Sequence, residues 1–248
     1  MLLTLISAKG SPGVTTSAAA LAAIGALDRA AQGVNQGVDL VELDPSGGDI
    51  EPLTGVTGES GLLGAASDLR VEALPEHTVQ APRGVRSLLA PTSSREANAT
   101  VVAALEGWGA ALSILDGIAV VDGGRWEAAQ PAADRLSGSD LVAMVCRPDA
   151  RGVEHVRHIA SDVRAAVYPA PVVLVTVGDQ PYKVGEVAEA INVPGCGALA
   201  WDPRGATALW GEGVGERRFM RWPSSWLARS ARGVLAELVH AASGVATR

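Results

Sequence analysis

The chain has 248 residues, of which 48% are hydrophobic and 19% are charged, and its formal net charge at pH 7 is −7. This length and apolar content suit one large α/β domain or two small ones, with enough apolar material for a core. The negative charge argues against broad coating of nucleic acid, although a local basic patch remains compatible with it.

Short apolar runs alternate with helix-length segments along the chain. The apolar runs predict strands at residues 2–7, 38–43, 85–90, 118–122, 141–147, 172–177 and 197–200. The segments between them predict helices at residues 15–31, 94–113, 126–137, 150–167, 183–191 and 203–210, followed by a C-terminal helix over about 224–242. Continuous apolar strands are typical of parallel sheets that are buried on both faces. The alternation therefore predicts an α/β fold with a doubly wound, mostly parallel sheet and helices on both faces. Because no linker separates the chain, we expect a single domain over residues 1–248.

The stretch AKGSPGVTTSA at residues 8–18 connects the first predicted strand to the first predicted helix. It has the outline of the phosphate-binding loop G-x-x-x-x-G-K-[ST]. Val14 stands where that motif has its lysine, and Ala8 replaces the first glycine. Taken alone, the stretch fits an ordinary β–α turn as well as it fits a phosphate-binding loop.

The remaining loop residues keep most of the chemistry of a phosphate site. Gly10, Gly13 and the start of the helix can offer backbone N–H groups to an anion. Thr15 stands at the Mg²⁺-ligand position, and Thr16 can donate a hydrogen bond to a phosphate. Val14 offers neither a charge nor a donor, so the lysine's contribution is missing.

Two further strand ends carry polar or glycine-rich segments. DPSGGD follows the second predicted strand and begins at Asp44, and DGGRW begins at Asp122, the last residue of the fourth. Ligands bind such sheets at the carboxyl ends of the strands. We therefore expect these segments to lie at the same edge of the sheet as residues 8–18, although a strand-end aspartate can also cap a turn or a helix.

Together these segments resemble the MinD/ParA group of deviant Walker A ATPases, over about residues 2–210. The group's loop K-G-G-x-G-K-[ST]-[ST] aligns here with the nucleotide-binding candidates Lys9, Gly10, Ser11, Pro12, Gly13, Val14, Thr15 and Thr16. VELDPSGGD and IAVVDGGRW are similar to the segments that carry the group's two conserved aspartates. The resemblance implies a P-loop fold that binds ATP and Mg²⁺ and forms a homodimer.

The resemblance also assigns roles to individual residues. Lys9 falls on the signature lysine, which reaches across the dimer to the partner's phosphates. Asp44 would orient the attacking water, and these two are the catalytic candidates. Thr15 would bind Mg²⁺ directly, and Asp122 would hold it through water.

The sequence departs from the group at Val14, the position of the general P-loop lysine. A charge-assisted hydrogen bond contributes on the order of 1.5–3 kcal/mol, so its loss weakens binding roughly ten- to a hundred-fold. We therefore favour a degenerate member that acts as a localisation or scaffold factor, with weak nucleotide binding and little hydrolysis. One alternative is an active partitioning or positioning ATPase in which Lys9 compensates for Val14. The other is an interaction module that binds no nucleotide.

Within the group, the degenerate loop looks most like the TadZ/CpaE branch, whose members localise Tad-type pilus machinery. SAKGSPGVTT with DPSGGD is also typical of actinobacterial MinD-like proteins. This placement implies protein partners from a pilus or positioning system, and the net charge argues against DNA binding.

The chain shows no signal peptide, no run long enough to span a membrane, and no paired cysteine spacing, so we expect a cytoplasmic protein. Leu227, Ala231 and Val234 begin an apolar stripe on the C-terminal helix. We expect this helix to pack on the domain; the alternative is peripheral contact with the inner face of the membrane. His155 and His158 share a helix face without a carboxylate-rich partner, and we expect solvated side chains rather than a metal site.

Overall fold

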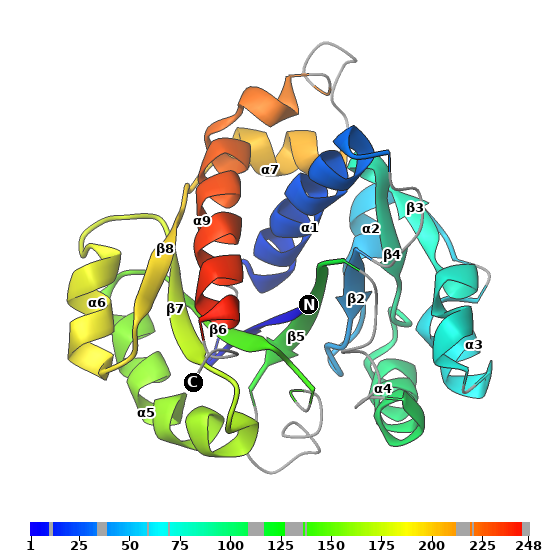
Figure 1. Ribbon diagram of the computed structural model, residues 1–248, viewed down its shortest axis with the longest axis horizontal. Helices are drawn as coiled ribbons and strands as arrows, with labels where there is room; N and C mark the ends of the chain where they lie inside the picture. The colour runs from blue at the N-terminus through cyan, green and yellow to red at the C-terminus, as the bar shows by residue number, and fades with distance from the viewer. Residues whose placement is uncertain are drawn as a thin grey trace.

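A mostly parallel sheet of eight strands runs through the part of the chain that the computed structural model describes, residues 1–9, 12–33, 39–58, 60–68, 70–108, 117–126, 136, 138–211, 219 and 221–244. Its strand order is β3-β4-β2-β5-β1-β6-β7-β8 (Figure 1). The strands are β1 (Leu2–Ser7), β2 (Leu40–Glu42), β3 (Val79–Ala81), β4 (Val85–Leu88), β5 (Ala119–Arg125), β6 (Leu141–Cys146), β7 (Val172–Val177) and β8 (Gly195–Leu199). Only the pairing of β3 with β4 is antiparallel among these strands.

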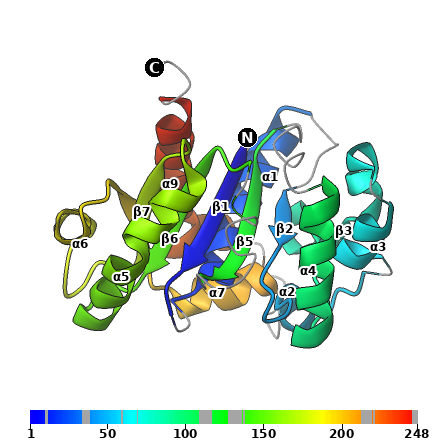
Figure 2. The same ribbon diagram turned by 90° about the horizontal axis from the view of Figure 1, so that it is seen from below.

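Helices cover both faces of the sheet (Figures 1 and 2). The described helices are α1 (Val14–Ala31), α2 (Ile50–Thr54), α3 (Gly61–Asp68), α4 (Ser94–Trp108), α5 (Ala150–Val167), α6 (Val184–Ile191), α7 (Pro203–Trp210) and α9 (Trp226–Ser243), with short 3₁₀ turns η1 (Val71–His77), η2 (Pro82–Gly84) and η5 (Trp222–Ser224). Helices α1, α7 and α9 share one hydrophobic cluster. On the opposite face, α5 and α6 share a second cluster, and α3 and α4 share a third.

Alternation along β1 explains how one strand serves both faces. Leu3 and Leu5 belong to the cluster under α1, whereas Leu2 and Ile6 belong to the clusters on the other face. All four side chains are at most 1% exposed. The strand, whose two polar residues Thr4 and Ser7 are also buried, therefore lies in the middle of the sheet.

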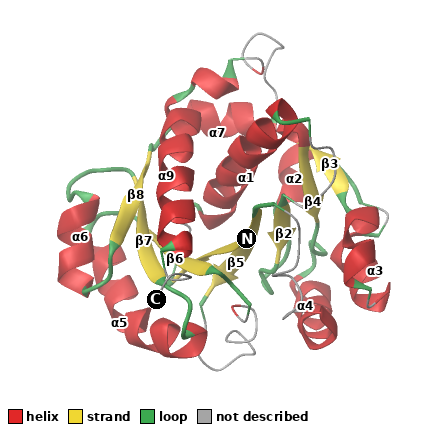
Figure 3. Cartoon of the chain, viewed as in Figure 1, coloured by secondary structure: helices red, strands yellow, loops and turns green. Residues whose placement is uncertain are grey.

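The predicted fold class is confirmed, and most predicted elements match the observed ones within two residues (Figure 3). The strand predicted at 118–122 extends to Arg125, and the strand predicted at 38–43 is shorter. The segment between β2 and β4 holds α2, α3, η1 and β3, none of which was predicted. These elements are short, at three to eight residues, and carry too few apolar positions to show a period.

Two predicted helices fall partly or wholly outside the described residues. The helix predicted at 94–113 is observed up to Trp108, and residues 109–116 are not described. Most of the segment predicted as a helix at 126–137 also lies outside the described residues. Gly33, expected to end the first helix, follows the cap residue Gln32 with a φ of 73° and donates its N–H to Ala30 O at 3.1 Å.

The C-terminal helix α9 packs on the sheet and on α1. Leu227, Ala231, Val234, Leu235 and Leu238 are each at most 5% exposed and belong to the cluster under α1. The apolar stripe is therefore covered by the chain itself and is not presented to a membrane surface. Among the described helices, none combines the length and apolar character of a membrane-spanning segment.

One ion pair joins α1 to the strands beside it. Arg29 contacts Asp39 through two hydrogen bonds, Nε–Oδ1 at 3.0 Å and Nη2–Oδ2 at 2.7 Å. Asp39 Oδ2 also accepts the Arg86 backbone N–H at 2.8 Å. The Asp39 side chain is only 5% exposed, so water screens this pair weakly.

We expect Asp39→Ala to lower the free energy of unfolding by about 3–5 kcal/mol, because it leaves a half-buried guanidinium without its carboxylate. Urea denaturation followed by circular dichroism measures the change. The matched control is Arg232→Ala, which breaks the exposed Arg232–Asp28 pair at 3.0 Å and is expected to cost less than about 1 kcal/mol. Equal losses in the two variants would show that burial of the Asp39 pair adds nothing.

Candidate functional site

The loop after β1 leads into α1 through a residue with a left-handed backbone conformation, which favours glycine. Gly13 is the N-cap of α1 and has a φ of 93°. Its carbonyl accepts the Ser17 N–H at 2.8 Å and so begins the helix. Gly10 and Ser11, both predicted to bind nucleotide, lie outside the described residues. Pro12 is buried, and Lys9 is exposed.

A cavity of about 330 Å³ opens at this helix start. The loop residues that line it are Pro12, Gly13, Val14, Thr15 and Thr16, and the other lining residues are Ser7, Asp44, Ser46, Asp49, Leu53, Gly124 and Arg125. The structure thus brings together Asp44 and the loop candidates Pro12, Gly13, Val14, Thr15 and Thr16, but not Lys9. We call this space the loop cavity.

Val14 has an apolar environment inside the fold as well as a place on the loop cavity. Its side chain is 7% exposed and belongs to the hydrophobic cluster under α1. It contributes no charge and no hydrogen-bond donor to the cavity. At the position where a P-loop has its lysine, this chain therefore has an apolar side chain that packs in the core.

Asp122 lies directly behind the loop cavity and links the loop to the sheet. Its carboxylate accepts a hydrogen bond from the Thr15 hydroxyl and another from the Gly124 N–H at 3.0 Å. The residue is 2% exposed. Burial raises the pKa of Asp122 to about 6, the Thr15 hydrogen bond opposes the shift, and the negative charge of Asp44 adds to it. The two predicted metal-binding residues are therefore in direct contact.

Asp44 is held against the end of β5. Its Oδ1 accepts the Ser46 N–H at 2.8 Å. Gly124 has a φ of 64°, and a Cβ atom at that position would overlap the Asp44 carboxylate. Glycine at position 124 leaves room for Asp44, so the second glycine of DGGRW shapes the site that the aspartate enters.

Glu42 is a site residue that was not among the candidates. It lies beside Asp122 in the register of β2 and β5 and is 1% exposed. Its Oε1 accepts the N–H groups of Asp49 and Ile50 at 2.9 and 3.0 Å, and its Oε2 accepts that of Ala90 at 3.1 Å. Burial raises the pKa of Glu42 to about 8, and the charge of Asp122 contributes to the rise. A carboxylate inside an otherwise apolar strand was the available sequence signal.

Negative charge dominates the lining of the loop cavity. Asp44 and Asp49 line it, Asp122 lies behind Thr15, and Arg125 is the one basic side chain among its described lining residues. Glu42, whose pKa is raised to about 8, adds little negative charge at pH 7. Burial and the charge of Asp44 also raise the pKa of Asp49. Such a lining attracts cations and repels phosphates, so a phosphate here needs a bound cation or protonated carboxyl groups to offset the repulsion.

Lys9 faces a different space. It lines a cavity of about 250 Å³ between the loop and the start of α5, together with residues such as Arg151 and His155. It is not among the described residues that line the loop cavity. Within one copy of the chain, Lys9 therefore does not take the place that Val14 leaves without a lysine.

A third, largely apolar cavity of about 330 Å³ adjoins the helix start. It shares Gly13 and Thr16 with the loop cavity and is also lined by Trp201, Pro203 and Leu227. A ligand with a phosphate above Gly13 and Thr16 could place a planar group against Trp201. Asp179, which follows β7, pairs with Lys183 at 2.7 Å.

The described residues contain no group of three or more His, Cys, Asp or Glu side chains arranged to hold a metal ion. His158 is exposed and lies 3.0 Å from Glu154 across one helical turn, which agrees with a solvated side chain. His155 is less exposed and lines the cavity that contains Lys9. The two histidines therefore have different surroundings.

No family model matches the chain, and no curated protein matches it in a sequence search. Solved structures do match. The chain is similar to a ParA family ATPase from Chlorobium tepidum TLS, with a TM-score of 0.70, 16% identity, and coverage of 96% of this chain and 98% of that one. It is similar to the MinD cell division ATPase of Pyrococcus furiosus, with a TM-score of 0.68, 18% identity, and coverage of 96% and 98%.

A third match is the septum site-determining protein MinD of Pyrococcus horikoshii OT3, solved in complex with Mg-ADP. Its TM-score is 0.68 at 15% identity, and the match covers 100% of this chain and 99% of that one. These identities are too low to transfer an activity, but the coverage is nearly complete on both sides. The chain has the MinD/ParA P-loop NTPase fold.

We expect wild-type stability to fall as the pH rises from about 5 to 8.5. The pKa of Glu42 is raised from its ordinary value of 4.5 to about 8, so folding favours the protonated form and loses that advantage as Glu42 ionises. One proton changes the free energy of unfolding by at most about 1.4 kcal/mol per pH unit. Urea denaturation at several pH values measures the slope.

Glu42→Gln is expected to flatten this slope, since the amide stays neutral and its oxygen can still accept the Asp49 and Ile50 N–H groups. The control is Glu189→Gln on the exposed face of α6, which should leave the slope unchanged. A Glu42→Gln protein with the wild-type slope would mean that another group causes the pH dependence.

Proposed function

We propose that the chain is a degenerate MinD/ParA-like protein that acts as a localisation or scaffold factor, with weak nucleotide binding and little or no ATP hydrolysis. The observation that carries this proposal is the place of Val14. The side chain at the P-loop lysine position is packed into the core, and the cavity in front of it is lined by carboxylates. A nucleotide would meet the helix start and two threonines there, but no lysine.

Retained features support weak binding rather than none. Gly13 keeps the left-handed turn that starts α1, and Thr15 contacts Asp122 as a metal-binding pair would require. The helix start can attract a phosphate, and Mg²⁺ would offset part of the carboxylate charge. We therefore propose ATP with Mg²⁺ as the ligand, with residues 10–16 around the phosphates and Lys9 outside the loop cavity.

The second candidate is an active positioning ATPase in which Lys9 replaces the missing lysine. The position of Lys9 outside the loop cavity weighs against this within one copy. A dimer in which Lys9 reaches the partner's phosphates remains the arrangement that the resemblance implies, with Asp44 orienting water. The third candidate, an interaction module without nucleotide, draws its support from the acidic lining of the cavity.

The finer assignment to the TadZ/CpaE branch rests on the degenerate loop sequence. It proposes a homodimer, protein partners from a pilus or positioning system, and a cytoplasmic location at the inner face of the membrane. The burial of the α9 stripe favours recruitment through such partners over insertion of that helix. DNA binding is not proposed, given the net charge of −7.

We expect the wild type to bind ATP–Mg²⁺ weakly in isothermal titration, and Val14→Lys to bind about ten- to a hundred-fold more tightly. The added ammonium supplies one charge-assisted contact to phosphate in an acidic cavity. Val14→Met, of similar length but uncharged, is the control and should bind like the wild type. If Val14→Lys and Val14→Met bind equally, the lysine position does not limit affinity.

Phosphate release by the wild type should stay close to background, and Asp44→Ala should not change it. Lys9→Ala should also leave turnover unchanged, because Lys9 lies outside the loop cavity. A steady-state phosphate-release assay with ATP and Mg²⁺ checks both variants. Turnover at ordinary ATPase rates that disappears in Asp44→Ala would overturn the proposed function, and its additional loss in Lys9→Ala would favour the active ATPase.

A further inference from the structure

The cavity that contains Lys9 carries an unusual set of side chains for an acidic protein. It lies between the end of β1, the end of β6 and the start of α5, and its volume is about 250 Å³. Its basic side chains are Lys9, Arg147, Arg151 and His155. We call it the cationic pocket. The function proposed above concerns the loop cavity and does not involve the cationic pocket.

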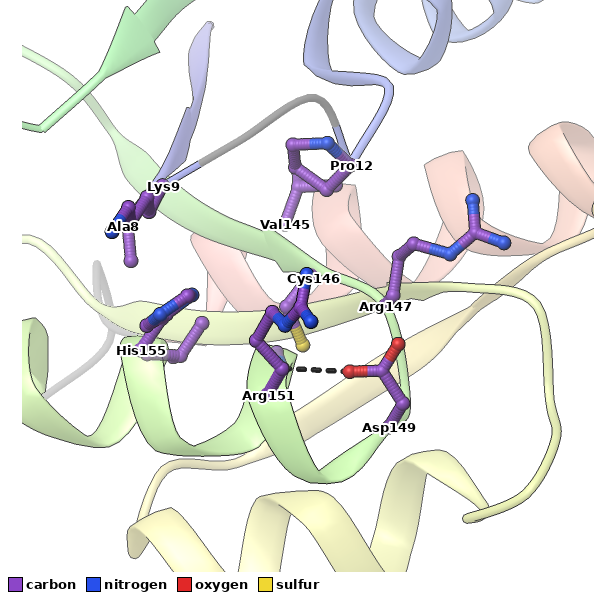
Figure 4. A pocket seen from close by; sticks show the side chains of 11 residues that line it. Ala8, Lys9, Pro12, Val145, Cys146, Arg147, Asp149, Arg151 and His155 are labelled. Carbon is purple, nitrogen blue, oxygen red and sulfur yellow. Dashed lines mark hydrogen bonds between the residues drawn. The ribbon is translucent and has the colours of Figure 1, made fainter.

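Figure 4 shows how these side chains are arranged. Arg151 and His155, one turn apart on α5, extend toward the loop that carries Lys9 and Pro12. Arg147 points away from them, and its guanidinium lies 4.0 Å from the centre of the Trp201 ring. Arg147 therefore forms the rim of the pocket, while Lys9, Arg151 and His155 surround its interior.

The permanent cations that line the pocket lack carboxylate partners among the described residues. Lys9, Arg147 and Arg151 form no ion pair with any described residue. In contrast, Arg157 lies 2.8 Å from Glu154. The positive charges of Lys9, Arg147 and Arg151 are thus not neutralised by an ion pair with any described residue.

Only one carboxylate lines the pocket among the described residues, and it is already engaged. Asp149 is the N-cap of α5, and its Oδ1 accepts the Gly152 N–H at 2.8 Å. Lys9 and Arg151, with Arg147 at the rim, therefore outnumber the single carboxylate that lines the pocket. The positive end of an 18-residue helix adds to the same potential.

We propose that the cationic pocket binds a phosphate group of a ligand separate from the nucleotide of the loop cavity. Guanidinium, ammonium and imidazole groups are the side chains that donate charge-assisted hydrogen bonds to phosphate oxygens. The volume accommodates one or two phosphate groups but is small for a whole nucleotide, because sites for drug-sized ligands measure about 300–1,000 Å³. The inference does not depend on the proposed function.

The probe is inorganic pyrophosphate, titrated calorimetrically into the full chain at low salt without nucleotide. Arg151→Gln should weaken binding at least tenfold, and Lys9→Gln, a change on a different element, should weaken it in the same direction. Arg157→Gln removes an equal charge from the same helix outside the pocket and should change the affinity less than twofold. Circular dichroism of each variant establishes that it is folded.

Two further arms identify the site and the source of the phosphate. Thr15→Ala combined with Thr16→Ala disables the loop cavity and should leave pyrophosphate binding intact. Flotation with phosphatidylcholine vesicles, with and without phosphatidic acid, tests a lipid headgroup. If the protein binds phosphatidic acid vesicles but not pyrophosphate, and Arg151→Gln loses this binding, the result would support the proposed site with a lipid headgroup as the source of the phosphate.

Several results would overturn the proposal. One is that neither probe binds the wild type, and another is that Arg151→Gln binds as tightly as the wild type. A third is that Arg151→Gln and Arg157→Gln weaken binding equally, which would indicate diffuse surface charge. A fourth is that the double threonine variant abolishes binding, which would place the anion at the loop cavity. If pyrophosphate binding is lost in Arg151→Gln and Lys9→Gln but in none of the other variants, the result would establish a soluble phosphate ligand.

Discussion

The parallel register of three central strands is the constraint on which the site depends. In that register β1 pairs Leu5 with Asp122 of β5, and β5 pairs Asp122 with Glu42 of β2. Because the carboxyl ends of parallel strands meet at one edge, segments more than 100 residues apart are fixed beside each other. The Thr15–Asp122 hydrogen bond then joins the first turn of α1 to the same edge. A shift in this register would separate the loop, the Thr15–Asp122 pair and Asp44.

Charge is distributed unevenly along this edge. Carboxylates line or lie behind the cavity at the start of α1, whereas uncompensated cations line the pocket at the start of α5. Lys9 lines one of these spaces, Gly13 lines the other, and Pro12 lines both. Two helix starts with similar dipoles thus have opposite local potentials, because side chains, not helix geometry, set the sign. Within one copy, Lys9 and Val14 therefore line different cavities.

The sequence predicted the sheet well because its central strands are mostly apolar. β1, β6 and β7 are buried along their whole length, and such runs have few alternatives to a central parallel strand. The region from α2 to β3 was not predicted, since its short elements are stabilised by contacts with the rest of the fold rather than by a periodic pattern. The cap of α3 illustrates this: its Leu62 N–H is satisfied by the Leu89 carbonyl, far along the chain.

For the site, the sequence by itself determined the residue types and their order: a glycine turn without its lysine, two aspartates at strand ends, and a C-terminal helix with an apolar stripe. Only the tertiary structure decided which groups share a space. It placed Val14 in the core, Lys9 in the cationic pocket, and Glu42 next to Asp122 with a raised pKa. It also buried the stripe of α9. The physical reason is that side-chain chemistry is local, whereas burial, charge pairing and access to a cavity depend on segments that only the folded chain brings together.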